Sequence, residues 1–242
     1  MGMAVGDALG TTLEFSSPRA PAFPNLATGP LREVVGGGPF HVAPGQVTDD
    51  TQLACCLAAS LLARGGFDAD DIARRYVEWM PKAFDIGSQT SESLHNCARG
   101  MEPLGAGKAA WGGPDYPRAG NGSLMRTAPI AIYFAHDADQ RRRASLVDSG
   151  ITHFDPRCRL ACAAFNAAIA HAIVADHEPT PAELLAAARR ELPFAADFLR
   201  AGPEAEAKSI DAGLAELRID LDAAELDDPG LYGAAGFHIH RQ

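Results

Sequence analysis

Apolar residues in this 242-residue chain recur mostly at the spacing of an amphipathic helix. No stretch shows the strict period-two alternation of a convincing β-strand. Glycine and proline fall between the helical segments, as expected of loops. The pattern therefore predicts an all-α fold, a single compact multi-helix domain over residues 1–242. The expected helices lie at about residues 51–64, 69–80, 124–135, 158–175, 181–190 and 204–216.

Two segments fall outside this simple pattern. The stretch from Pro103 to Gly122 is rich in glycine and proline, and its length predicts a functional loop. Near the start, Gly2, Gly6 and Gly10 lie at i, i+4 and i+8. One interpretation is a helix whose glycine stripe lets another backbone approach closely, which would bring nearby acids to that contact. The other is a flexible, non-helical terminus, and both stay open.

Composition narrows the class of partners. The formal net charge of −10 argues against a surface that neutralises nucleic-acid phosphates. The five cysteines form no Cys-x-x-Cys pair and their number is odd, so neither a disulfide framework nor a zinc site is indicated. No run of about 18 uncharged apolar residues and no N-terminal signal segment occurs. We expect a cytoplasmic protein that binds neither nucleic acid nor membrane.

The segment Thr48-Asp49-Asp50 places a hydroxyl and two carboxylates where a loop becomes an apolar helix. These oxygen donors suit Mg²⁺ or Mn²⁺ and do not suit zinc, because hard cations prefer carboxylate, hydroxyl and water. The same residue types are also common at helix starts, where they cap free amides and favour the helix dipole. The segment is therefore either a metal site or an ordinary helix start.

Other polar clusters also lie at helix borders, where converging helix ends can build a shared site. The turn Asn121-Gly122-Ser123 suits contact with a phosphate or ribose, although it is also an ordinary capping turn. His153 is a candidate proton carrier or ligand-contacting donor, with a simple loop histidine as the alternative. Asp85, between apolar neighbours, has either a perturbed pKa or a role as the cap of the next helix.

Taken together and in this order, the clusters resemble the ADP-ribosylglycohydrolase family, in particular its bacterial members of the dinitrogenase reductase-activating glycohydrolase type. The resemblance covers nearly the whole chain. It implies an all-α domain with two Mg²⁺ or Mn²⁺ ions in a cleft, which removes ADP-ribose from a modified protein side chain. The matching segments are Gly6-Asp7-Ala8-Leu9-Gly10 through Glu14-Phe15, Pro44-Gly45 with Thr48-Asp49-Asp50-Thr51, Asp85-Ile86-Gly87, Asn121-Gly122-Ser123-Leu124-Met125-Arg126, and Ile151-Thr152-His153.

The resemblance also implies roles for individual residues. It implies that Thr48, Asp49 and Asp50 bind the metal ions. Glu14 would act as a gating or acid/base carboxylate, and Asp85 would face the reacting ribose; the general base is not assigned between these two. The residues implied to line the ADP-ribose pocket are Gly87 and Ser88 near the distal ribose, with Asn121, Gly122, Ser123, Met125 and His153.

The chain departs from the family pattern at one motif. A second metal motif, Gly-x-Asp-x-Asp-Thr or close to it, is usual near the C-terminus of the family and does not occur here. We therefore expect a domain shortened at both ends, lacking its C-terminal part, with an incomplete metal shell and an uncovered apolar face that promotes self-association. The expected activity is Mg²⁺-dependent hydrolysis of ADP-ribosyl-arginine, or of an O-linked ADP-ribose. The alternatives are an impaired relative that binds ADP-ribose weakly or not at all, and a helical scaffold without a ligand.

Overall fold

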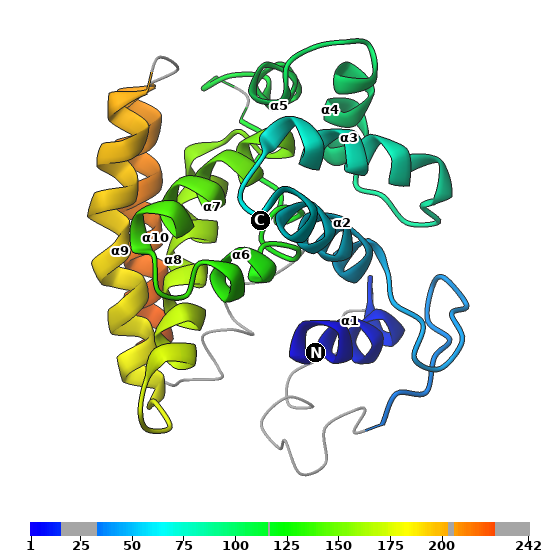
Figure 1. Ribbon diagram of the computed structural model, residues 1–242, viewed down its shortest axis with the longest axis horizontal. Helices are drawn as coiled ribbons and strands as arrows, with labels where there is room; N and C mark the ends of the chain where they lie inside the picture. Colours follow the sequence, from blue (N-terminus) through cyan, green and yellow to red (C-terminus); the bar gives the residue numbers. More distant parts are fainter. Residues whose placement is uncertain (16–32, 116, 203–205, 226–242) are drawn as a thin grey trace.

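The computed structural model describes residues 1–15, 33–115, 117–202 and 206–225. This part of the chain is built from α-helices and two short 3₁₀ helices, which confirms the all-α prediction (Figure 1). The helices are α1 (Gly2–Gly10), η1 (Thr11–Leu13), α2 (Asp49–Arg64), α3 (Ala69–Trp79), η2 (Met80–Lys82), α4 (Ser88–Ala98), α5 (Pro103–Trp111), α6 (Ala128–Tyr133), α7 (Ala138–Thr152), α8 (Pro156–Val174), α9 (Pro181–Ala201) and α10 (Ala207–Glu225).

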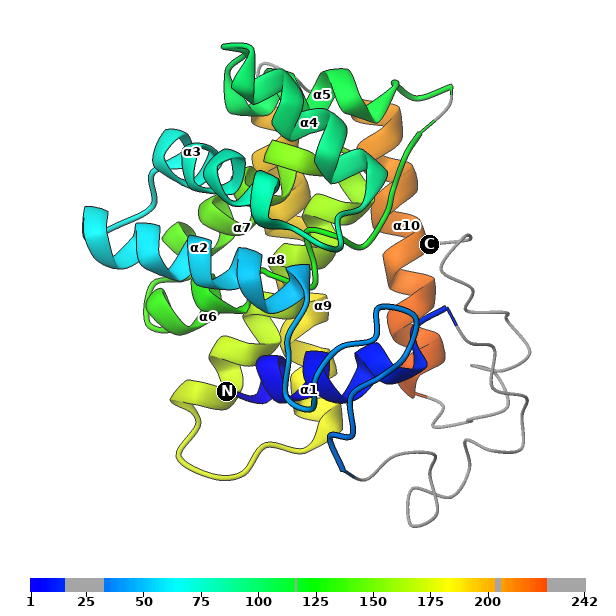
Figure 2. The same cartoon turned by 90° about the vertical axis from the view of Figure 1, so that its right-hand side faces the viewer.

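Helix α7 lies between two hydrophobic clusters. On one side it shares a cluster with α2, α3, α4 and α6, and on the other it shares a cluster with α8, α9 and α10. It also packs closely against α5. Figures 1 and 2 show α8, α9 and α10 side by side at one edge of the molecule, with α1 beneath the N-terminal half of α2. The first cluster includes Leu53, Leu57, Leu61, Ile72, Tyr76, Leu94, Ile130, Ala144 and Ile151, and the second includes Leu146, Leu160, Leu192, Leu199, Ile210 and Leu214.

Local sequence explains where several helices begin. Asp68, Asp137 and Asp155 each accept a hydrogen bond from a backbone amide in the first turn of α3, α7 and α8. Thr180 and Glu183 form a reciprocal capping box at the start of α9. These caps satisfy amides that have no partner within the helix, so the polar residues mark the helix starts in the sequence.

The structure corrects several expected boundaries. The expected helix at 124–135 shrinks to α6, because Asn121 turns the chain and its carbonyl accepts from the amides of Leu124 and Met125. The segment expected as a loop contains α5, which Glu102 caps and whose Trp111 is buried. Helix α9 continues to Ala201, beyond the expected segment. Helix α7 was missed because its inward face carries polar side chains, which break the apolar periodicity.

The N-terminal glycines lie in a helix, but the reason expected for them is wrong within the described chain. A Cβ atom added to Gly2, Gly6 or Gly10 would meet nothing within 4 Å. No described backbone therefore approaches this stripe closely. The acid beside the stripe, Asp7, instead reaches the start of α2.

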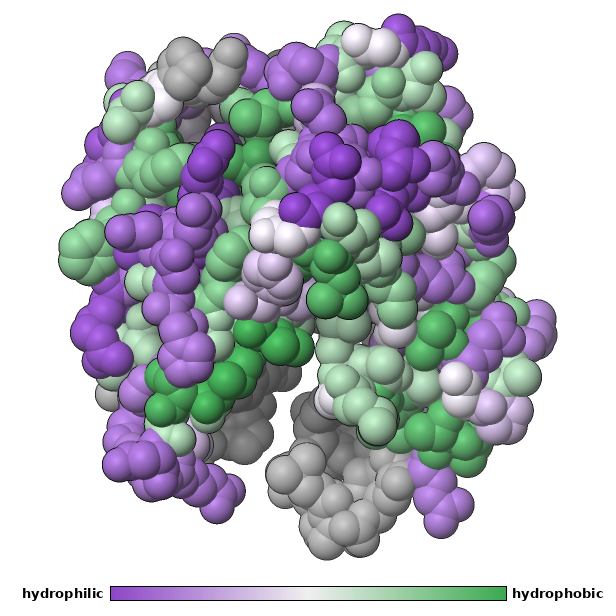
Figure 3. Space-filling model, viewed as in Figure 1, coloured by the Kyte–Doolittle hydropathy of each residue, from purple (hydrophilic) through white to green (hydrophobic). Residues whose placement is uncertain are grey.

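Helix α8 is long and apolar enough, by length and composition, to cross a membrane. Half of its apolar window is buried, and α8 packs against α7, α9 and α10. This is the pattern of a core helix. Some of its apolar side chains, including Phe165 and Ile173, remain exposed. Figure 3 shows green, apolar side chains bordering a hollow between the α8–α9 side of the molecule and α1.

Gly107 sets the distance between α5 and α7. A Cβ atom at this position would lie 1.8 Å from the backbone oxygen of Gly150, a distance no structure can accommodate without moving a helix. We expect Gly107→Ala to destabilise the protein by about 1–3 kcal/mol or more, as an overpacked core does. Chemical unfolding of the variant would measure this loss.

Gly105 on the same helix provides the control. A Cβ atom there would approach the Glu102 side chain at 2.8 Å, and a flexible side chain can move aside. Gly105→Ala should therefore change stability far less than Gly107→Ala, since alanine also favours the helix. Equal losses for the two variants would contradict the close helix crossing.

Candidate active site

The carboxylate of Asp7 fixes the start of α2. It accepts hydrogen bonds from the Thr48 amide at 3.0 Å and the Thr48 hydroxyl at 2.9 Å. It also accepts from the Thr51 amide at 3.2 Å and the Thr51 hydroxyl at 2.6 Å. Thr48 is the N-cap residue of α2, yet its side chain makes no capping bond. The hydroxyl instead lies between Asp7 and Asp50, and the carboxylate of Asp7, from another helix, caps the first turn of α2.

Four more carboxylates gather around this point from three segments. Glu14 directly follows η1, Asp49 and Asp50 lie in the first turn of α2, and Asp85 lies between η2 and α4. Asp49 and Asp85 act directly on one another, since each shifts the pKa of the other. The charges of all four act on one another, so they form one electrostatic unit, here called the carboxylate cluster.

Burial and mutual repulsion make these groups hard to ionise. Burial, followed by the charges of Asp85 and Asp50, raises the pKa of Asp49 to about 8. The same three causes, in the same order, raise the pKa of Glu14 to about 7. Burial and then the charge of Asp7 raise the pKa values of Asp50 and Asp85 as well. A bound cation would relieve this repulsion and displace the retained protons.

The donor set suits a hard cation, but the described residues do not surround one point. Within the segments that the structure describes, no three Asp, Glu, His or Cys side chains are grouped closely enough to hold a metal ion. Among the proposed donors, Thr48 Oγ1 lies 3.2 Å from Asp50 Oδ2. The oxygen chemistry and the raised pKa values therefore fit Mg²⁺ or Mn²⁺, with part of the shell left for water or other ligands.

A second group of residues lies just beyond Asp85 in the chain. Gly87 is the N-cap of α4, so Asp85 does not cap this helix. A Cβ atom added to Gly122 would lie 2.8 Å from the His153 ring and 3.3 Å from the Thr90 hydroxyl of α4. The start of α4, the Gly122 turn and His153 thus meet at one place, where free amides can contact an anionic ligand.

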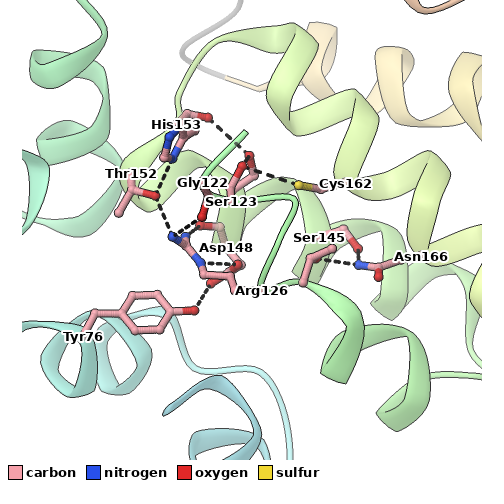
Figure 4. A network of polar contacts seen from close by, with 12 residues as sticks. Tyr76, Gly122, Ser123, Arg126, Ser145, Asp148, Thr152, His153, Cys162 and Asn166 are labelled. Carbon is pink, nitrogen blue, oxygen red and sulfur yellow. Dashed lines mark hydrogen bonds and ion pairs between the residues drawn. The ribbon is translucent and has the colours of Figure 1, made fainter. Parts of the chain in front are cut away.

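A buried ion pair holds this second group in place (Figure 4). The Arg126 guanidinium donates from Nε to Asp148 Oδ2 at 3.3 Å, and both side chains are fully buried. The Tyr76 hydroxyl donates to the other carboxylate oxygen at 2.8 Å. From Nη1, Arg126 donates to Thr152 Oγ1 at 2.8 Å and to the Gly122 carbonyl at 3.4 Å. Arg126 therefore ties the Gly122 turn to the end of α7.

The same network contacts the His153 ring. Thr152 Oγ1, which accepts from Arg126, lies 2.8 Å from His153 Nδ1. In the tautomer in which Nδ1 accepts the Thr152 hydroxyl hydrogen, the ring proton is on Nε2, beside Gly122. Burial, and then the charges of Arg126 and Arg118, lower the pKa of His153 to about 3. With this pKa the His153 ring is neutral at neutral pH.

Comparison with known proteins gives this arrangement a family. The family model described as ADP-ribosylglycohydrolase matches residues 1–237. The chain belongs to the ADP-ribosylglycohydrolase family. It is similar to the ADP-ribosylarginine hydrolase Tri1 of Pseudomonas putida (strain GB-1), with 39% identity over 162 residues, 63% of this chain and 40% of that protein. It also resembles the ADP-ribosyl-[dinitrogen reductase] glycohydrolase of Rhodospirillum rubrum, with 34% identity over 72% of this chain and 56% of that protein.

Among solved structures, the chain is similar to one titled "ADP-ribosylglycohydrolase-related protein complex". The TM-score is 0.60 at 35% identity, over 77% of this chain and 57% of the other. The chain spans about half the length of the curated relatives it matches. The chain therefore shares its family and fold with these longer proteins.

The structure brings the site residues implied by the resemblance into two adjoining groups. Glu14, Asp85 and the Thr48–Asp50 segment form the first, and the start of α4 with the Gly122 turn and His153 forms the second. Within the family motif around Gly122, two side chains point inward. The Ser123 hydroxyl bonds to the Ser149 hydroxyl at 2.8 Å, and Met125 packs on the first hydrophobic cluster. Asn121 and Ser88 are exposed.

Three residues that organise the candidate site have no role predicted from the sequence: Asp7, Arg126 and Asp148. Asp7 belongs to the motif Gly6-Asp7-Ala8-Leu9-Gly10. Its contact with Thr48 joins residues that are 41 positions apart in the sequence. Arg126 ended another motif without an assigned role. Its partner Asp148 lies on α7, a helix that apolar periodicity missed. An arginine directly after the apolar pair Leu124-Met125 is a local signal for a buried ion pair.

His153 should make stability depend on pH. Its folded-state pKa of about 3 lies below the usual 6.5, so the unfolded chain binds this proton more readily. Stability associated with this group is present above pH 6.5 and is lost as the pH falls toward 3, by up to about 1.4 kcal/mol per pH unit. We expect His153→Gln to remove this part of the pH dependence. The measurement is denaturant unfolding of both proteins at pH 7 and pH 5.

The quantity to compare is the difference in unfolding free energy between the two proteins at each pH. The carboxylate cluster also changes stability with pH, in the direction opposite to His153. The raised pKa values of Glu14 and Asp49 add stability as the pH falls. That contribution is common to the wild type and to His153→Gln, so it cancels. A constant stability difference between pH 7 and pH 5 would show that His153 takes up its proton in the folded state.

Proposed function

We propose that this domain hydrolyses the N-glycosidic bond between ADP-ribose and an arginine side chain, with Mg²⁺ or Mn²⁺ as cofactor. The observation that carries the proposal is the adjacency of two unlike groups. The carboxylate cluster lies beside a group of free amides and a neutral histidine, and Asp85-Ile86-Gly87 connects them directly. The names of two similar relatives, ADP-ribosylarginine hydrolase and ADP-ribosyl-[dinitrogen reductase] glycohydrolase, agree with this reaction class.

The amide-rich group is suited to the ADP-ribose part. The Nε2–H of His153 and the backbone at Gly122 offer donors, and the first turn of α4 adds amides with the positive end of the helix dipole. Pyrophosphate and ribose oxygens accept such hydrogen bonds. Because Gly122 has no side chain, the His153 ring and the Thr90 hydroxyl can pack against its backbone, and the Arg126–Asp148 pair holds the turn in place.

The carboxylate cluster is suited to the reacting end. Thr48, Asp49 and Asp50 would hold the cation, which when bound supplies charge stabilisation and orients ribose hydroxyls and water. Glu14 and Asp85 are left to move protons. In the reaction, water adds to the anomeric carbon, the carbon–nitrogen bond breaks, and a proton passes to the departing guanidine. A carboxyl group with a pKa of about 7, as in Glu14, exchanges protons readily at neutral pH.

One observation favours a second function. No three acidic side chains of the described segments surround a single point, so the metal shell drawn from this part of the chain is incomplete. A domain of this kind would bind ADP-ribose without efficient turnover. The two functions share the amide-rich group and differ in whether the carboxylate cluster supports catalysis.

Calorimetric titration of ADP-ribose into the 242-residue chain tests the proposal, once with excess Mg²⁺ and once with EDTA. We expect binding that is stronger with Mg²⁺, because the ion offsets the repulsion between pyrophosphate and carboxylates. Turnover of ADP-ribosyl-arginine then separates hydrolase from binder. A folded sample that binds no ADP-ribose in either buffer would reject both functions.

A further inference from the structure

Three phenylalanine rings form a row next to the carboxylate cluster. Phe15 and Phe40 meet edge to face with centroids 6.0 Å apart, and Phe40 meets Phe84 in the same way at 5.8 Å. The rings come from three separate segments: the end of η1, the loop before α2, and the connection from η2 to α4. We call these three residues the aromatic row.

The aromatic row borders both carboxylates that are left to move protons. Phe15 directly follows Glu14, and Phe84 directly precedes Asp85. Both rings are largely outside the core, with Phe15 60% exposed and Phe84 44% exposed. The three rings belong to neither hydrophobic cluster. Packing of the core therefore does not explain why they lie beside these acids.

Backbone strain supports a role for the row. Phe15 has a φ of 54° and His41, next to Phe40, a φ of 51°, a region that residues other than glycine rarely adopt. The loop that carries Phe40 is closed by paired backbone hydrogen bonds between Gly37 and Val42. A Cβ atom at Gly38 would lie 2.7 Å from the Thr11 carbonyl, so the loop sits directly on η1. The fold thus holds two of the rings in place at a conformational cost.

We propose that the aromatic row binds the guanidinium of the modified arginine and selects arginine-linked over hydroxyl-linked ADP-ribose. The inference rests on the proposed hydrolysis of ADP-ribosyl-arginine and assigns the part of the site that contacts the leaving group. A guanidinium is planar and weakly hydrated, and it stacks favourably on aromatic faces. The neighbouring acids add a negative potential that a cation favours and a neutral seryl group does not.

Charge complementarity decides between a cation and a purely apolar partner. The rings are flanked by Glu14 and Asp85, and the charges of Asp49, Asp50 and Asp7 act on these groups. An apolar protein surface placed here would bury those acids without a counter-charge, which is costly. A guanidinium supplies the counter-charge and the flat surface together.

The test replaces single rings while keeping their apolar character. Phe84→Leu and Phe15→Leu remove the aromatic face, and Phe84→Tyr retains it. Phe165→Leu is the matched control, because Phe165 is 45% exposed on α8, away from the carboxylate cluster. For each protein we would measure KM and kcat for ADP-ribosyl-arginine and the calorimetric Kd for free ADP-ribose, all with excess Mg²⁺. Free ADP-ribose lacks the guanidinium and so reports on the other part of the site.

We expect each leucine variant at the row to raise KM for ADP-ribosyl-arginine about two- to fivefold, the loss of one exposed cation–π contact. The kcat value and the Kd for ADP-ribose should stay at the wild-type level, and Phe84→Tyr and Phe165→Leu should match the wild type throughout. A parallel loss of affinity for ADP-ribose in the leucine variants would overturn the inference and leave the proposed function intact. Wild-type protein that binds no ADP-ribose would overturn both.

Discussion

Asp49→Asn is expected to lower hydrolysis of ADP-ribosyl-arginine at least about 100-fold while raising the melting temperature of the metal-free protein. Replacing groups that merely support a metal ligand already lowers activity about 10–100-fold, and Asp49 is proposed as a ligand itself. The gain in stability has a separate cause. Burial and the charges of Asp85 and Asp50 disfavour ionised Asp49, and asparagine is a neutral group of the same shape.

The pKa of Asp49 determines how the stability gain from Asp49→Asn depends on pH. The folded-state pKa of Asp49, about 8, lies above its value of 3.8 in the unfolded chain. Stability linked to this group is therefore fully present below pH 3.8 and is lost as the pH rises through 8. The gain from Asp49→Asn in EDTA should be larger at pH 8 than at pH 5. Excess Mg²⁺ should raise the melting temperature of the wild type and leave that of Asp49→Asn nearly unchanged.

Asp70→Asn serves as the control for charge removal. Asp70 is an exposed acid in the first turn of α3, so its replacement should lower stability slightly and leave hydrolysis unchanged. If Asp49→Asn instead lowered the melting temperature in EDTA as Asp70→Asn does, Asp49 would be stabilised by its surroundings. The carboxylate cluster would then have no unmet need for a cation.

The helices that sequence reasoning recovers are those whose buried face is apolar. In α2 and α3, Leu53, Leu57 and Ile72 return at helical spacing and all are buried, so the period alone defines the helix. Helix α7 buries Asp148 and Ser149 at positions where the pattern requires apolar residues. Their partners lie in other segments, so no local signal in α7 can reveal them. Periodicity alone therefore cannot predict α7, because the burial of its polar side chains depends on tertiary contacts.

The candidate site, like the fold, could be predicted only in part from the sequence. Thr48 and Asp50 could be placed together from the sequence, because adjacent residues at a helix start share one location. That Asp7 bonds to Thr48 could not be predicted, and neither could the meeting of Phe40 with Phe84. These contacts depend on how α1 and two loops pack around α2. The raised pKa values follow from the same convergence, so they too are properties of the fold.

Asp148→Ala is expected to destabilise the protein by about 3–5 kcal/mol, the usual effect of removing one partner of a buried ion pair. The alanine would leave the Arg126 guanidinium fully buried without its counter-charge, and the Tyr76 hydroxyl without its acceptor. For a chain of this size, each kcal/mol lowers the melting temperature by roughly 2–4 °C. Thermal and denaturant unfolding would measure the loss, with Asp139→Ala as the control, because Asp139 pairs with Arg142 at the surface.

A double variant separates the buried charge from the packing that surrounds it. Arg126→Met in the Asp148→Ala background removes the unpaired guanidinium, and we expect it to recover part of the lost stability, since an apolar side chain needs no counter-charge. The double variant should still bind ADP-ribose more weakly than the wild type. Arg126 is the residue that connects the Gly122 turn to Thr152 and, through it, to His153. Stability that returned together with full ADP-ribose affinity would show that the ion pair supports the fold and does not position the site.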